Sequence, residues 1–203
     1  MLGLTQIARR AGRERGFTAF ELLFVVTLVA TMSGVSVPPV LRALDDYRAA
    51  AATRYVATRL QRMRMEAVLR SADVGAKFVL VGNQYTFRNY IDGNRNGIST
   101  ADVQNGIDRP LGGMERLTDY FADVDFGAMP GLPAVDGSGP PPGDDPIHLG
   151  TNDIVTFSAN GSSSTGSLYI RSRTKQYVVR IYGDTGKTRL LVFDPGSRQW
   201  RPL

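Results

Sequence analysis

The sequence predicts an α+β protein in which one long N-terminal helix packs on a C-terminal antiparallel β-sheet domain. An apolar run occupies residues 17–37, and an alanine-rich stretch without Gly or Pro follows from Val40 to about Arg70. After residue 73, apolar and polar residues alternate, which is the pattern of strands that bury one face. A chain of 203 residues is long enough for one globular domain and an additional segment.

The run from Phe17 to Val37 has the length and composition of a membrane span. Its 21 residues contain one charged side chain, that of Glu21. A helix of this length spans roughly 30 Å, the thickness of the hydrocarbon core of a bilayer. Residues 1–16 contain four arginines and one glutamate. This basic flank predicts a single-pass anchor with a cytoplasmic N-terminus and the chain after residue 40 outside.

Two simpler interpretations of the apolar run leave Glu21 unexplained. A secretory signal peptide would place a small-residue cleavage site after the run, but that end reads Ser33-Gly-Val-Ser-Val-Pro-Pro39. A plain signal anchor is the second interpretation. Neither accounts for a carboxylate within the run, where an unpaired charge is costly and implies a partner and a function.

The segment Arg15-Gly16-Phe17-Thr18-Ala19-Phe20-Glu21 resembles the class III leader of type IV pilins and pseudopilins. In that family a prepilin peptidase cuts after the glycine, the new N-terminal phenylalanine is N-methylated, and a glutamate stands fifth after the cut. The resemblance implies processing at Gly16 and Phe17 and assembly through Phe17 and Glu21. It makes residues 1–16 a removed leader and 17–37 the transmembrane helix. Ala19-Phe20 departs from the Leu or Ile of many members, which is an apolar-for-apolar change.

The resemblance also implies how subunits associate. Cleavage frees an amine on Phe17, and the Glu21 carboxylate of one subunit can neutralise the amine of a neighbour, which offsets the cost of burying either charge. The implied partners are other pilins or pseudopilins, the prepilin peptidase and an inner-membrane assembly platform. The implied location is the bacterial inner membrane, with the C-terminal domain in the periplasm, and a place at the filament tip is compatible with it.

Residues 38–73 are expected to continue the helix outside the membrane as an amphipathic segment. Pro38-Pro39 and the nearby Gly34 predict a kink or a weak segment at residues 34–39, because proline removes a backbone donor. Beyond it, spacings of four, three and four place a set of apolar residues on one face. These are Val56, Leu60, Met63 and Ala67.

Residues 74–203 are expected to form the β-rich domain, with a flexible Pro/Gly-rich surface loop at 127–150. A hairpin is predicted around Gly82-Asn83, a favoured turn pair. The expected strands are Val74–Val81, Gln84–Ile91, Thr118–Phe126, Asp153–Ser158, Ser167–Ser172, Gln176–Tyr182 and Thr188–Phe193. Along residues 177–182 the side chains should alternate between the two faces of the sheet.

The finer pattern is similar to the GspH/FimT branch of the pilin-like proteins. The motifs that carry this similarity are Arg64-Met-Glu66-Ala67, Asp92-Gly-Asn94-Arg-Asn96-Gly97, Val155-Thr-Phe157 with Asn160-Gly161, and Thr185-Gly186-Lys187-Thr188-Arg189. The branch implies a minor pseudopilin or pilin in a periplasmic filament for type II protein secretion or type IV pilus biogenesis.

A DNA-binding minor pilin that acts in DNA uptake is the alternative. The net charge of +5 is unevenly spread, since residues 165–203 hold eight basic and two acidic side chains. The branch includes DNA-uptake pilins with a Gly-Arg-x-Arg-like C-terminal motif, and this chain has Lys where those have Arg, which loses the bidentate fork. The candidate DNA-binding residues are Lys187, Arg189, Arg198 and Arg201.

The sequence contains no arrangement typical of an enzyme, and no cofactor is expected. It has no cysteine and a single histidine, His148, so thiolate metal sites and Ser-His-Asp catalysis are not indicated. Asp92, Asn94 and Asn96 mimic the start of a calcium loop, but the twelfth position is Val103 instead of a bidentate Glu. A simple Asn/Asp/Gly turn is the competing interpretation.

Overall fold

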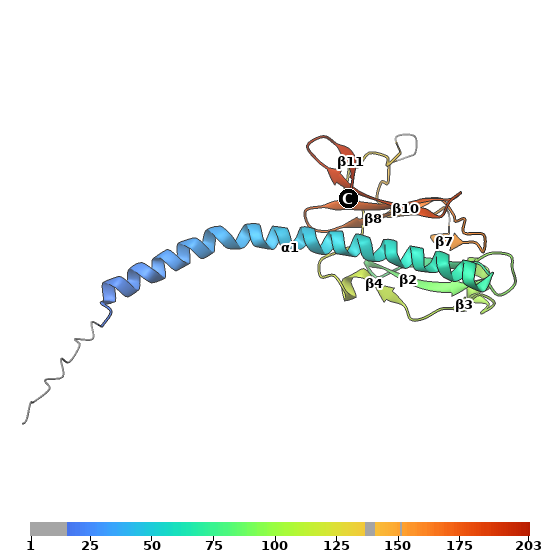
Figure 1. The fold of residues 1–203 in the computed structure, drawn as a ribbon, viewed down its shortest axis with the longest axis horizontal. Helices are drawn as coiled ribbons and strands as arrows, with labels where there is room; N and C mark the ends of the chain where they lie inside the picture. The colour runs from blue at the N-terminus through green and yellow to red at the C-terminus, as the bar shows by residue number, and fades with distance from the viewer. Residues whose placement is uncertain (1–15, 137–140, 151) are drawn as a thin grey trace, which may run out of the picture. The chain divides into compact units, whose positions relative to one another are not determined.

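The computed structural model describes residues 16–136, 141–150 and 152–203 (Figure 1). The chain divides into two compact units, Met1–Leu41 and Arg42–Leu203, and each is described by itself. The predicted leader, apart from Gly16, lies outside the described residues. The predicted α+β class is confirmed, because one long helix is followed by two antiparallel sheets.

Helix α1 runs from Ala19 to Arg70 as 52 consecutive helical residues. Pro38 and Pro39 lie inside the helix, so the segment predicted to kink or weaken at residues 34–39 does not end it. Each proline lacks one N–H, so the carbonyls of Gly34 and Val35 lose their intrahelical donors. The flanking hydrogen bonds carry the helix across this gap.

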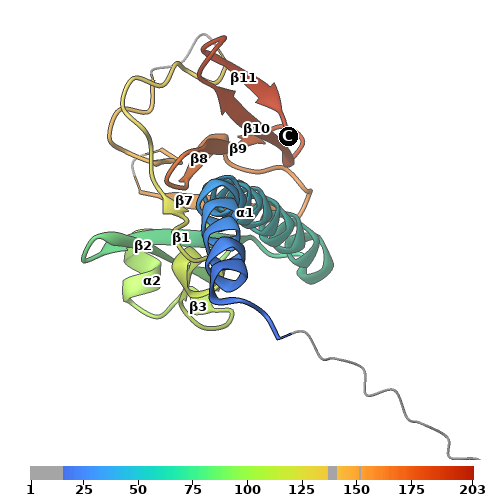
Figure 2. The same ribbon diagram turned by 90° about the vertical axis from the view of Figure 1, so that its left-hand side faces the viewer.

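The part of α1 that belongs to the second unit buries one face. The predicted core residues Val56, Leu60, Met63 and Ala67 are all buried, which confirms the periodicity argument. Ala49 and Ala52 extend the same face and have no exposed surface. Their short side chains bring the helix close to both sheets, and Figure 2 shows this part of α1 between them.

One sheet is built on the hairpin of β1 and β2. Its strand order is β3-β2-β1-β7, and β4 also pairs with β2. The bounds are β1 Val74–Val81, β2 Gln84–Ile91, β3 Arg109–Pro110, β4 Glu115–Arg116 and β7 Ile154–Phe157. The predicted turn at Gly82-Asn83 is present, with a positive φ of 65° at Gly82. A short helix, α2 (Thr100–Gln104), was not predicted and lies between β2 and β3.

The other sheet is formed mainly by the C-terminal third of the chain. Its order is β11-β10-β9-β8-β5, and β6 also pairs with β8. The bounds are β5 Asp125–Phe126, β6 Ile147–His148, β8 Gly166–Arg171, β9 Gln176–Tyr182, β10 Lys187–Asp194 and β11 Gln199–Pro202. The predicted alternation along β9 holds: Val179 and Ile181 join the core under α1, and Val178 joins a second cluster on the opposite face.

The strand predicted at Thr118–Phe126 is largely wrong. The segment forms a 3₁₀ turn at Leu117–Asp119 and only its last two residues pair as β5. Asp123 has a φ of 64°, which a strand does not allow. Turns, and not the alternation of a strand, bring three apolar side chains of the segment into the core. These are Leu117, Val124 and Phe126.

The Pro/Gly-rich loop predicted at 127–150 is docked on the sheet along its first part. Leu132 is buried in the second apolar cluster with Tyr169, Val178 and Leu191, and Trp200 packs against this cluster. The Trp200 indole donates to the Pro133 carbonyl at 3.1 Å. Residues 127–136 of the predicted surface loop therefore contact the sheet, and the flexibility of the loop stays a prediction.

Replacing Leu60 by Ala should lower the free energy of unfolding by about 2–5 kcal/mol, because the side chain is fully enclosed between α1 and the sheets. Denaturant unfolding of the full chain in detergent measures this loss. Met65 is 65% exposed on the same helix, so Met65→Ala should change stability by less than about 0.5 kcal/mol. Equal losses in the two variants would contradict the assignment of the buried face.

Candidate functional site

The predicted processing residues lie just before the helix. Gly16 and Phe17 are not helical, and Phe17 is 75% exposed. Thr18 caps α1: its hydroxyl accepts from the Glu21 N–H at 3.2 Å, and its carbonyl accepts from the Leu22 N–H at 3.1 Å. The Gly16-Phe17 bond is therefore outside the helical hydrogen-bond ladder.

Glu21 lies in the first turn of α1, where the helix dipole favours a negative charge. Thr18 and Glu21 together have the Thr-x-x-Glu spacing of a capping box. Thr18 was not among the predicted site residues, although this spacing is a sequence signal that could have found it.

The first unit presents an apolar surface. The most apolar stretch of α1 has a mean hydropathy of 1.9 and contains no buried residue, and α1 is long and apolar enough to cross a membrane. The exposed large side chains of its first turns include Phe20, Leu22, Leu23 and Phe24. Such a surface is stable only against lipid or against other apolar helices.

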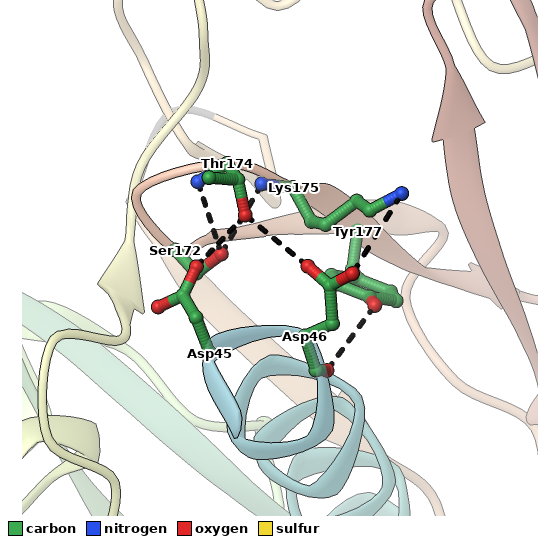
Figure 3. A network of polar contacts seen from close by, with 6 residues as sticks. All are labelled: Asp45, Asp46, Ser172, Thr174, Lys175 and Tyr177. Atoms are coloured by element: carbon green, nitrogen blue, oxygen red, sulfur yellow. Dashed lines mark hydrogen bonds and ion pairs between the residues drawn. The ribbon is translucent and has the colours of Figure 1, made fainter. Parts of the chain in front are cut away.

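A polar cluster fixes α1 where the second unit begins (Figure 3). The Thr174 hydroxyl lies 2.9 Å from an Asp45 carboxylate oxygen and 3.1 Å from one of Asp46. Lys175 is 3.9 Å from Asp46, and the Tyr177 hydroxyl donates to the Asp46 carbonyl at 3.4 Å. Burial, with Asp46 nearby, raises the pKa of Tyr177, so its hydroxyl stays protonated as a donor. The turn between β8 and β9 is thus tied to the helix, a role the sequence did not reveal.

Three of the motifs that suggested the GspH/FimT branch meet at the other end of α1. The Arg64 guanidinium donates to the Gly161 carbonyl at 2.9 Å, and Gln61 donates to the Thr188 hydroxyl at 3.1 Å. A Cβ at Gly186 would lie 2.5 Å from the Gly161 carbonyl oxygen, so only glycine fits there. These motif residues therefore join the helix to two turns of the β-domain.

The four basic candidates for DNA binding do not lie on one face. Lys187 and Arg189 share a face of β10 with Leu191, in the second cluster. Arg201 is opposite Val192, on the other face, and pairs with Asp194 at 2.6 Å. Arg198 lies in the β10–β11 turn, at the opposite end of β10 from Lys187. The structure therefore separates the predicted patch into two pairs.

The calcium-like loop is closed by its own hydrogen bonds. Asp92 accepts from the backbone N–H groups of Asn94, Arg95 and Gly97 at 2.8–2.9 Å. Asn94 accepts from the Asn96 N–H at 3.3 Å. Among the described residues, no group of three or more His, Cys, Asp or Glu could hold a metal ion. The arrangement is that of an Asx-type turn.

A groove of about 880 Å³ lies beside the tip of the β1–β2 hairpin. It is lined on one side by Val81 and Asn83 and on the other by Asp125 and Arg171. Asp125 accepts from the Phe126 N–H at 2.7 Å. Burial raises the pKa of the Asp125 carboxyl, and the Phe126 N–H and the Arg171 charge only partly oppose this.

These features define a pilin-like protein. Its exposed apolar helix is capped at the N-terminus by Thr18 and continues into a β-rich domain. Residues 52–186 match the family described as type II transport protein GspH, so the chain belongs to the GspH family. The predicted GspH/FimT branch is thereby confirmed. Between type II secretion and type IV pilus biogenesis, the family supports type II secretion.

The minor pseudopilin EpsH from the type 2 secretion system of Vibrio cholerae is a solved structure to which the chain is similar. The two share 14% identity over 71% of this chain and 97% of the other, with a TM-score of 0.44. No curated protein matches the chain.

Replacing Asp125 by Asn should raise stability at neutral pH. The pKa of the Asp125 carboxyl is raised in the folded protein. Its contribution to the free energy of unfolding is therefore full below its ordinary pKa of about 4, and this contribution is lost as the pH rises through the raised pKa. The gain from Asp125→Asn should therefore be seen at pH 7 and should shrink toward pH 3. Unfolding of the full chain in detergent across this range measures it.

Asp123→Asn is the matched control, because Asp123 instead pairs with Arg173 at 3.0 Å. This change should not stabilise the protein at pH 7. If Asp125→Asn instead lowered the stability by the same amount at every pH, the ionised Asp125 carboxylate would not be what destabilises the folded protein.

Proposed function

We propose that this protein is a minor pseudopilin that is made as a precursor and assembled into a periplasmic filament of a type II secretion system. A prepilin peptidase removes residues 1–16, and the new N-terminus at Phe17 is methylated. Residues 17–37 hold the subunit in the inner membrane before assembly, with residues 1–16 cytoplasmic. Residues 38–73 carry the helix into the periplasm, and residues 74–203 form the domain that the filament displays.

The observation that carries this proposal is the geometry of Gly16 to Glu21. The bond to be cut precedes the Thr18 cap, so a peptidase can bind it in an extended form without unwinding α1. The carboxylate of Glu21 is one helical turn from the N-terminus that cleavage would create. An amine and a carboxylate in an apolar setting each require a partner, and a stacked subunit supplies both.

The apolar surface of the first unit supports the same proposal. Its exposed side chains suit lipid before assembly and the helices of other pseudopilins afterwards. Membership of the GspH family supports a structural role over a catalytic one. The partners in this proposal are the other pseudopilins, the peptidase and the inner-membrane assembly platform.

Mass spectrometry of the protein recovered from cells tests the processing step. In cells with prepilin peptidase, the mass should correspond to loss of residues 1–16 and gain of one methyl group. Gly16→Ala, or deletion of the peptidase, should leave the N-terminus intact. Gly34→Ala is the matched control, since an added Cβ meets no atom within 4 Å at either glycine. An intact N-terminus in every sample would make residues 17–37 an ordinary anchor.

Replacing Glu21 by Gln tests the assembly step separately. This variant should be cleaved normally, because the scissile bond is unchanged, but it cannot neutralise a neighbouring amine. Cross-linking to other pseudopilins in cells should fall about tenfold or more, as expected for a buried charge that is left unpaired. Unchanged cross-linking with normal cleavage would remove Glu21 from the assembly contact.

A further inference from the structure

A small pocket lies between the last turns of α1 and the sheet that contains β2. Its volume is about 320 Å³, and Arg59, Arg62, Glu66 and Asn89 provide its polar wall. Pro110, the last residue of β3, and the following Leu111 and Gly112 also line it. No motif of the sequence analysis pointed to it, because its residues come from three separate segments.

Two buried polar atoms of this pocket lack partners. Within the described residues, the Arg59 Nε and the Asn89 Oδ1 are buried and make no hydrogen bond. Asn89 stands between Phe87 and Ile91 on the face of β2 that packs toward α1, where an apolar residue would be expected. Unpaired polar atoms are rarely buried, so their occurrence on one pocket wall needs an explanation.

The charges around the pocket leave one cation unbalanced. Arg59 contacts the Glu115 carboxylate through its Nη2, and Glu66 is held by Arg70 at 2.8 Å. Glu115 also accepts from the Tyr55 hydroxyl at 2.6 Å. Arg62 is exposed and, in the part of the chain that the structure describes, makes no ion pair. The site therefore offers about one net positive charge.

We propose that this pocket binds a carboxylate group. The Arg59 Nε–H and the Arg62 guanidinium are donors suited to a carboxylate, and charge-assisted bonds of this kind are the strong ones. Asn89 completes the set through its amide, which can accept from an N–H beside the carboxylate. A doubly charged phosphate fits less well, because the Glu66 carboxylate lines the same pocket.

N-acetyl-L-alanine is a suitable probe because it carries one carboxylate next to an amide N–H. Titrated into the full-length chain in detergent, it should shift the Arg59 Nε–H resonance in ¹⁵N NMR spectra. Arg62→Gln should weaken binding about tenfold or more, the usual range for a lost charge-assisted bond. Arg54→Gln, an exposed arginine of the same helix outside the pocket, should bind as the parent does.

The Asn89→Leu variant distinguishes two explanations of the unpaired Asn89 Oδ1, a binding site and a packing defect. This variant should lose affinity for N-acetyl-L-alanine while staying folded, because leucine suits a core-facing strand position. The proposal would be overturned if the Arg59 Nε–H resonance did not move, if Arg62→Gln bound normally, or if inorganic phosphate bound more tightly than N-acetyl-L-alanine.

The carboxylate can belong to a free acid or to a side chain of a neighbouring subunit, and only the second source rests on the proposed function. Cross-linking of the Arg62→Gln and Arg54→Gln chains to other pseudopilins in cells distinguishes them. A loss confined to Arg62→Gln would indicate a neighbour's side chain, and equal cross-linking would indicate a free acid. Failure of Gly16 processing would refute the filament proposal while leaving the binding result in place.

Discussion

The β-domain depends on a single surface, the buried face of α1 in the second unit. Two sheets meet on this face, and alanines at positions 49 and 52 let both approach the helix closely. Leu60 and Met63 then fill the space that the alanines leave between the layers. Neither sheet could bury its inner face without the helix, so the helix is a third layer of the domain and not an appendage to it.

The features that could be predicted from the sequence are those that local pattern determines. The β1–β2 hairpin follows from alternation and a Gly-Asn turn, and the buried face of α1 follows from helical spacing. The 117–126 segment could not be predicted, because its apolar residues reach the core through turns. The docking of residues 127–136 depends on distant side chains: Gln176 bonds the Gly127 carbonyl and the Met129 N–H, and Trp200 bonds Pro133.

The same distinction applies to the functional residues. Gly16, Phe17 and Glu21 lie within six consecutive residues, and the resemblance of this short segment to the class III leader suggested their roles. The basic candidates appeared as one group because they are close along the chain, yet strand alternation sends Arg189 and Arg201 to opposite faces. Arg62 and Asn89 show the reverse case, since they are far apart in sequence and only the fold brings them to one pocket.

The two prolines inside α1 have a consequence for where water must reach the helix. The carbonyls of Gly34 and Val35 have no helical donor, and an unsatisfied carbonyl is costly in hydrocarbon. From Ala19 to Val35 the helix rises by about 25 Å, slightly less than the thickness of a hydrocarbon core. If the helix spans a bilayer as proposed, these carbonyls would lie within about 5 Å of the edge of the hydrocarbon core, where water can reach them, and the proline pair would set the depth of the helix.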